Sequence, residues 1–326
     1  MIQTTLPEGW TQVTVADEGL YESFFAQNTD MFSYENNWAF ISQETRNGAI
    51  KYHRNGLLLT GVVRHEQSKF RFIFPPLGIL GGSEAQLCSI LHDLANNSDK
   101  RIVFRKLPQH LSDALVRTHK FTSVPANAFT HTRDLPEDIY PQVILNVRDT
   151  SRCESAHFVK IRNHLRHFSQ HRPKTVDLTA DRIKDVVTLI EAWTEEYKRR
   201  GRYLFGDVSK PLAVDSSAYS IFAHRFADRI DGYNYFSKIV YVDNRAVAFT
   251  LAGRTSPRSA ALYGSISLTA YRGAAEHLIM QLIEDLATKD VDSLNMGGSE
   301  TKGLFDFKNK FCTKELRYCY DAEYIA

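Results

Sequence analysis

The chain has 326 residues, of which 43% are hydrophobic and 24% are charged, and its formal net charge is +2. A chain of this length and composition can bury a large core, which predicts a globular protein of two domains. The small net charge creates no overall field that would require a nucleic-acid partner. Any binding of anions must therefore come from local clusters of charge.

The four cysteines are scattered and form no Cys-x-x-Cys pair. This spacing argues against a disulfide scaffold and against a zinc ribbon. Residues 1–13 lack a basic start followed by an apolar core, and no run approaches the roughly 20 apolar residues that cross a bilayer. We therefore expect a cytoplasmic protein with no metal site and no membrane-spanning segment.

The first half of the chain reads as a meander followed by alternating helices and strands. Turn signals and alternating apolar residues predict three antiparallel strands over 48–74. Ser83 is a suitable N-cap for a helix over 83–95 with one apolar face. A buried strand over 101–104 and a short helix over 108–118 complete the pattern.

The second half repeats this order of elements. We expect a hairpin over 235–254, a third strand over 259–266 and a helix over 274–287. A strand over 291–296, a short helix over 303–311 and a closing strand over 315–325 follow. Two helices, over 154–171 and 180–201, precede the hairpin. Because the residues themselves are not visibly duplicated, the repeat is one of structure. It predicts two domains, 1–145 and 146–326, each a mixed, largely antiparallel sheet flanked by helices.

The stretch "LNMGGSETKGLFDFKNKF" (294–311) places two glycines and a loop between a strand and a short helix. It resembles the C-terminal part of the Fem-type aminoacyl transferases. "KIRNHLRHF" followed by "IEAWTEEY" resembles the tandem-GNAT domain of phosphatidylglycerol lysyltransferases, and the likeness is clear over about residues 155–326. The resemblance implies an α/β (α+β) chain of two tandem GNAT-like domains. It also implies an acyltransferase that moves an aminoacyl group from aminoacyl-tRNA to an amine or hydroxyl, with the active site in the second domain.

The loop that holds the coenzyme A pyrophosphate in ordinary acetyltransferases of this fold is degenerate here. Its pattern is Arg/Gln-x-x-Gly-x-Gly/Ala at a helix N-terminus, but this chain has Arg272-Gly-Ala-Ala275-Glu-His277. Both glycine positions are lost, and His277 would crowd the second. We therefore expect aminoacyl-tRNA as the donor, a small-molecule or peptide acceptor, and no permanently bound cofactor. The alternatives are an acyl-CoA-dependent N-acyltransferase and a catalytically silent module that binds RNA or a protein partner.

Three residues are the catalytic candidates. The Lys308 cation can stabilise the carbonyl oxygen that becomes negative when an amine attacks an ester, or it can bind phosphate. A solvated lysine is the alternative, and the resemblance favours a role in the site. Glu300 is the candidate general base for that amine, with a surface carboxylate as the alternative. Tyr263 lies on a strand beside the expected opening of the sheet. Gly297 and Gly298 would let a substrate approach the backbone there, although a tight turn would need them equally.

The remaining candidates are expected to contact a substrate. Arg162 and Arg166 lie one turn apart on a basic helix and can hold a phosphate or carboxylate between them, but a solvated basic face explains the pattern equally well. Trp193 and Tyr197 have a spacing that is more often found in a core. The other expected substrate-binding residues are Asn163, Ser265, Asn295 and Ser299.

Overall fold

The structure is a computed structural model. It describes residues 8–27, 34, 36–44, 48–54, 56–64, 69–72, 83–97, 101–118, 120–125, 140–199, 223–224, 226, 229, 234–299 and 301–325. The chain forms two compact units. The first consists of Met1–Glu137, Thr255–Pro257 and Arg317–Ala326, and the second of Asp138–Arg254 and Arg258–Leu316.

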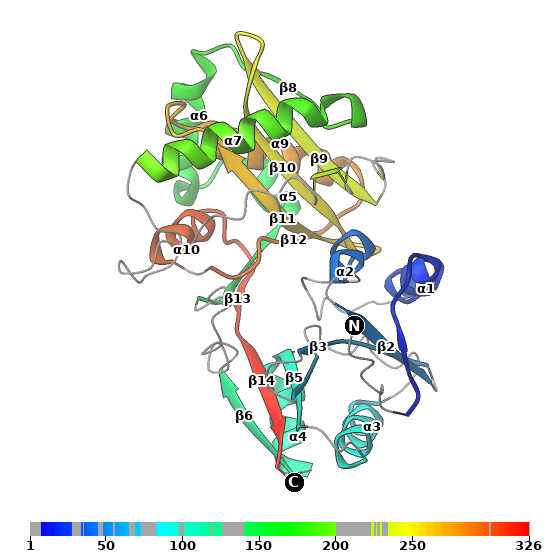
Figure 1. Ribbon diagram of the computed structural model, residues 1–326. Helices are drawn as coiled ribbons and strands as arrows, with labels where there is room; N and C mark the ends of the chain where they lie inside the picture. Colours follow the sequence, from blue (N-terminus) through cyan, green and yellow to red (C-terminus); the bar gives the residue numbers. More distant parts are fainter. Residues whose placement is uncertain are drawn as a thin grey trace. The chain divides into compact units, whose positions relative to one another are not determined.

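The first unit is built on a seven-stranded sheet with the strand order β1-β2-β3-β4-β5-β14-β6. Its strands are β1 (Trp10–Gln12), β2 (Ala49–Arg54), β3 (Leu57–Arg64), β4 (Lys69–Phe72), β5 (Arg101–Pro108), β6 (Phe121–Pro125) and β14 (Cys319–Tyr324). Its helices are η1 (Val15–Asp17), α1 (Glu18–Gln27), α2 (Trp38–Glu44), α3 (Glu84–Asn96) and α4 (Gln109–Thr118) (Figure 1). The predicted meander is present as β2, β3 and β4.

The second unit also contains a seven-stranded sheet, with the order β13-β7-β12-β11-β10-β9-β8. Its strands are β7 (Gln142–Asn146), β8 (Lys174–Asp177), β9 (Tyr235–Val242), β10 (Arg245–Ser256), β11 (Ser259–Ser267), β12 (Ser293–Asn295) and β13 (Glu315–Arg317). Its helices are α5 (Val147–Arg152), η5 (Ala156–Phe158), α6 (Val159–Ser169), η6 (Ala180–Arg182), α7 (Ile183–Arg199), α9 (Ala274–Thr288) and α10 (Lys302–Asn309). The two helices expected before the hairpin therefore each begin with a short 3-10 turn.

The two sheets share one topology, which confirms the predicted structural repeat. In each, an antiparallel three-strand meander is followed by a helix and a strand that pairs in parallel with the last strand of the meander: β4 with β5, and β11 with β12. Each sheet also contains one strand that does not belong to this repeated order of elements, and this strand lies second from one edge. β14 lies between β5 and β6 and is antiparallel to both, and β7 lies between β12 and β13.

The C-terminus differs from the expectation of one closing strand over 315–325 in the second domain. The segment is split into two strands at Tyr318, whose side chain is exposed. β13 stays in the second sheet, whereas β14 pairs with β5 and β6 of the first. The last residues of the chain therefore belong to the first unit, because the backbone hydrogen bonds of β14 are made there.

Local sequence explains where several elements begin and turn. Ser83 accepts a hydrogen bond from the Gln86 backbone N–H and Gln86 Oε1 accepts one from the Ser83 N–H, so a capping box starts α3. Asp243 and Asn244 both have positive φ, 49° and 62°. Two left-handed residues form the tight turn whose twist suits a hairpin, and they join β9 to β10.

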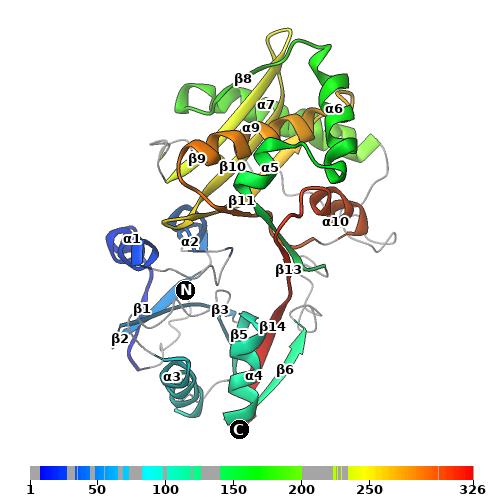
Figure 2. The same ribbon diagram turned by 180° about the vertical axis from the view of Figure 1, so that it is seen from behind.

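Helices cover both faces of the second sheet. Figures 1 and 2 view it from opposite sides, and α7 lies in front of the strands in the first while α9 lies in front in the second. Leu278, Leu282 and Leu286 of α9 are buried against the sheet. The side chains of Leu262 and Leu294 belong to the same core and therefore face α9. Alternation then places Tyr263 and Asn295 on the opposite face.

No helix among the described ranges is both long and apolar enough to cross a membrane.

Candidate functional site

The glycine pair lies in a buried turn that Asn295 shapes. The Oδ1 atom of Asn295 accepts a hydrogen bond from the Gly297 N–H at 2.8 Å, and its Nδ2 donates to Gln142 Oε1 at 2.8 Å. Gly297 has a φ of 72°, which a side chain would strain. Asn295 was expected to contact substrate, but both ends of its amide are bonded within the protein. Its role here is to hold the turn.

Lys308 reaches this turn from α10. Its Nζ donates a hydrogen bond to the carbonyl oxygen of Gly298. α10 is placed by Thr301, whose side chain accepts a hydrogen bond from the Leu304 N–H at 3.2 Å. The fold thus brings together Lys308 and the glycine pair, two of the features that the resemblance singled out.

Ser299 adds a buried hydroxyl to the same turn. The residue is 0% exposed, and its carbonyl oxygen accepts a hydrogen bond from the Tyr140 N–H at 3.0 Å. Its Oγ has no hydrogen-bond partner among the described residues. A buried hydroxyl without a partner is unfavourable, so this atom is suited to bind a polar ligand group. Glu300, the candidate general base, lies outside the described residues.

Tyr263 and Ser265 of β11 lie in different surroundings, one buried and the other exposed. Tyr263 is buried, and its ring lies 5.6 Å from that of Phe226. Phe226 in turn packs edge-on against Tyr235, so Tyr263 belongs to an aromatic cluster. Ser265, two residues further along β11, is exposed.

A second buried hydroxyl, which the sequence did not predict, lies on this face of the sheet. Ser237 of β9 is 2% exposed, and its Oγ has no partner within the described part of the chain. The neighbouring Lys238 points towards α9, where it meets Asp285. Ser237 therefore shares the opposite face with Tyr235. The one signal in the sequence was a serine inside an otherwise apolar strand, which is too common to indicate a site.

The two arginines of α6 do not act as the expected pair. Arg162 directs Nη1 to the carbonyl oxygens of Cys153, Glu154 and Ser155, at 2.8, 3.0 and 2.8 Å. These carbonyls lie in the connection between α5 and η5, so the guanidinium ties this connection to α6. Arg166 and Asn163 are exposed. Of the two guanidinium groups, only that of Arg166 lies on the exposed surface of α6.

Trp193 and Tyr197 form a ring pair on α7, with centroids 4.5 Å apart. Trp193 is buried and Tyr197 is half-buried. This arrangement agrees with the interpretation of the pair as part of a core.

The N-terminus of α9, where a coenzyme A pyrophosphate would bind, is packed against α6. The N-cap, Gly273, has a φ of 91°, and a Cβ added to it would lie 2.3 Å from the carbonyl oxygen of His164. The backbone of α6 therefore occupies the space next to this turn.

Glu276 holds three helices together at the same place. The residue lies in the first turn of α9 and is 5% exposed. Its Oε1 atom accepts a hydrogen bond from Lys310 Nζ at 2.6 Å and lies 2.6 Å from His164 Nδ1. Burial opposes ionisation of Glu276, but the hydrogen bonds and charge of Lys310 and the contact with His164 outweigh it and lower its pKa.

His277 gives a test of this packing through the pH dependence of stability. Its Nε2 is 2.8 Å from Thr175 Oγ1, and burial lowers its pKa below the ordinary 6.5. The unfolded chain therefore takes up the proton first, and the free energy of unfolding should fall as the pH drops below about 6.5. The His277→Gln variant should lack this part of the slope. Urea unfolding of both proteins between about pH 5 and pH 8 measures the difference; identical slopes would contradict it.

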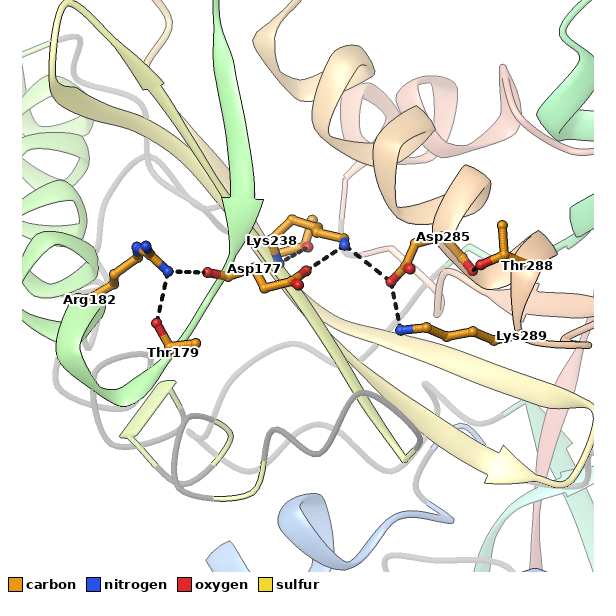
Figure 3. Close-up of polar contacts among 8 residues, drawn as sticks. Asp177, Thr179, Arg182, Lys238, Asp285, Thr288 and Lys289 are labelled. Carbon is orange, nitrogen blue, oxygen red and sulfur yellow. Dashed lines mark hydrogen bonds and ion pairs between the residues drawn. The ribbon is translucent and has the colours of Figure 1, made fainter.

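A network of charges on α9, β8 and β9 serves a structural purpose (Figure 3). Lys238 Nζ contacts Asp177 Oδ1 at 2.5 Å and Asp285 Oδ2 at 3.2 Å, and Lys289 contacts the same Asp285 oxygen at 3.2 Å. Burial disfavours the charged form of Lys238, yet the two carboxylates outweigh it and raise its pKa. The network fastens α9 to the edge of the sheet and gives no indication of a substrate site.

The chain matches no protein-family model and no curated protein, but its fold is shared with solved structures. A conserved protein of unknown function from Bacteroides thetaiotaomicron is similar with a TM-score of 0.73 at 16% identity, over 97% of this chain and 99% of the other. FemX is similar with a TM-score of 0.64 at 11% identity, over 97% of each chain. The C-terminal DUF2156 domain attributed to a lysylphosphatidylglycerol synthetase of Agrobacterium fabrum has a TM-score of 0.63 at 10% identity, over 96% of this chain and 93% of the other.

These likenesses concern the fold. They confirm the predicted fold class, a mixed α/β chain of two similar halves, each with a largely antiparallel sheet flanked by helices. They also include the two kinds of protein that residues 294–311 and the basic helix resembled.

Proposed function

We propose that the protein is an acyltransferase that moves an aminoacyl group from aminoacyl-tRNA to an amine or hydroxyl acceptor. The observation that carries the proposal is the bond from Lys308 Nζ to the carbonyl of Gly298, which precedes Ser299. The buried hydroxyl of Ser299 has no partner in the part of the chain that the structure describes. A cation on α10 therefore meets a buried turn of two glycines that is followed directly by Ser299. The shared fold with FemX supports the same reaction class.

The chemistry follows from the charge that develops during acyl transfer. When an amine or hydroxyl attacks an ester, the carbonyl oxygen becomes negative, and a fixed cation nearby stabilises that charge. The Gly298 carbonyl holds the Lys308 ammonium beside the turn. The Ser299 hydroxyl can donate to or accept from a polar group of the aminoacyl moiety. No covalent intermediate on the protein is required.

The contacts at the N-terminus of α9 support aminoacyl-tRNA rather than coenzyme A as the donor. A coenzyme A pyrophosphate needs several backbone N–H groups converging on it. Here the Ala274 N–H donates to the Tyr271 carbonyl, and the carboxylate of Glu276 accepts its own backbone N–H. Residues present at this position therefore do not fit coenzyme A. A tRNA instead spreads its phosphates over a basic surface, and Lys160, Arg166 and Arg172 are all exposed on or next to α6.

The test compares donors directly. With charged tRNA, we expect loss of the aminoacyl group that depends on an added acceptor amine; with acetyl-coenzyme A, calorimetry at millimolar ligand should show no binding. Arg166→Ala should weaken tRNA binding and reduce the slope of log K against log salt by about 1. Arg245→Ala, an exposed arginine at the β9–β10 hairpin, is the matched control and should leave the slope unchanged.

The opposite results identify the alternatives. Submicromolar affinity for coenzyme A, or turnover with an acyl thioester alone, would make the protein an acyl-CoA-dependent N-acyltransferase. Turnover with neither donor in a folded protein that still binds tRNA would identify a silent RNA-binding module.

A further inference from the structure

The side chain of Glu276 occupies a place that is built to bind an anion. The first turn of a helix presents unpaired N–H groups and the positive end of the helix dipole. At the start of α9 two basic side chains from other helices converge on the same point, Lys310 next to α10 and His164 on α6. Both contact one oxygen of Glu276, which is itself almost fully buried.

The surrounding backbone closes this place from one side. Gly273 lies so near the His164 carbonyl that even a methyl group would clash with it, at 2.3 Å. His277, the next residue after Glu276, packs its ring 5.2 Å from that of Phe168. An external phosphate would have to displace a carboxylate that two basic groups and a backbone N–H already hold.

We propose that Glu276 is an intramolecular anion that fills the α9 N-terminal anion site and excludes phosphate ligands from it. Glu276 is therefore a specificity-determining residue, because its carboxylate prevents a phosphate from binding at the N-terminus of α9. When its carboxylate is removed, Lys310, His164 and the backbone N–H of Glu276 should accept a small external oxyanion in its place. The proposal concerns this site alone and does not rest on the proposed transfer reaction.

Asp285 provides a matched control on the same helix. Its carboxylate also contacts two lysines, Lys238 and Lys289, at 3.2 Å each. It lies in the last turn of α9, where the helix presents carbonyl groups and the negative end of its dipole. Loss of this carboxylate should leave two lysines but no converging N–H groups, and hence no anion site.

The experiment measures rescue of stability by formate and, for the wild type, binding of inorganic phosphate. Glu276→Ala should unfold at a lower temperature than the wild type, and formate should raise the unfolding temperature saturably, by ~2–4 °C at tenfold above its Kd, relative to chloride at equal ionic strength. Asp285→Ala and the wild type should respond to formate and chloride alike. Adding Lys310→Ala to Glu276→Ala should abolish the rescue.

Two further variants keep the test decisive. Glu276→Ser opens the same space and replaces Glu276→Ala if the latter does not fold. Glu276→Gln removes the charge but keeps the shape of the side chain, which still occupies the space of the carboxylate, so formate should not rescue it. Three results would overturn the proposal. The Ala or Ser variant could respond equally to formate and chloride, or formate could rescue the Gln or the Asp285→Ala variant. The wild type could also bind phosphate saturably, in a way that Lys310→Ala removes.

Discussion

Replacing Lys308 with alanine should lower the rate of acyl transfer by about 10²-fold, as the loss of one donor to a developing oxyanion does. Lys308 is the cation that the structure holds at the glycine turn, through the carbonyl of Gly298. Its side chain is half-buried at the margin of α10 rather than within the core. The unfolding temperature should therefore change little while the initial rate falls. The measurement is the rate with charged tRNA and a saturating acceptor amine.

Lys302 is the control for this variant because it lies on the same helix. Its Nζ pairs with Asp306 at 2.6 Å, and both side chains are exposed. Lys302→Ala removes an equal charge from α10 without touching the glycine turn, so the rate should stay within about twofold of the wild type, as expected for a solvated surface pair. A folded Lys308→Ala protein with wild-type activity would remove Lys308 from the mechanism. Equal losses in both variants would show that the net charge of α10 matters and not the position of Lys308.

Replacing Asp321 with alanine should destabilise the first unit by about 3–5 kcal/mol, the cost of leaving a buried charge without its partner. Asp321 is 0% exposed, and Arg105 is 2% exposed. The carboxylate accepts hydrogen bonds from Arg105 Nε at 3.1 Å and from the Lys106 N–H at 3.0 Å. This pair joins β14 to β5, so its loss should also weaken the pairing of β14 with the first sheet. Urea unfolding gives the free energy, and hydrogen exchange of β14 amides reports the weaker pairing.

Two comparisons identify the cause of this loss. Asp292→Ala removes a carboxylate from an exposed pair with Arg258 at 2.6 Å, and it should cost less than about 1 kcal/mol. Combining Asp321→Leu with Arg105→Met removes both charges and should recover much of the stability, because the buried cation is then gone. A cost below about 1 kcal/mol for Asp321→Ala would mean that water reaches Arg105 and that the pair does not anchor β14.

The sequence by itself determined the local elements and their order. Alternation of apolar residues located the meanders, Asp243 and Asn244 marked the hairpin turn, and Ser83 marked the start of α3. These features depend on residues within a few positions of one another, where side-chain periodicity and backbone preferences act. The same local reasoning related residues 294–311 to a strand, a glycine turn and a helix, and these elements are present.

Only the tertiary structure decided which distant groups meet. The basic pattern of α6 did not reveal that Arg162 binds the carbonyls between α5 and η5, whereas Arg166 is exposed. Nor did the sequence indicate that Glu276 meets Lys310 and His164, or that β14 leaves the second sheet for the first. Hydrogen-bond and ion-pair partners far apart in the chain depend on strand pairing and helix packing, which periodicity does not encode. A charged residue has the same local pattern whether it meets solvent, a backbone carbonyl or a buried carboxylate, so its role followed from its position in the fold.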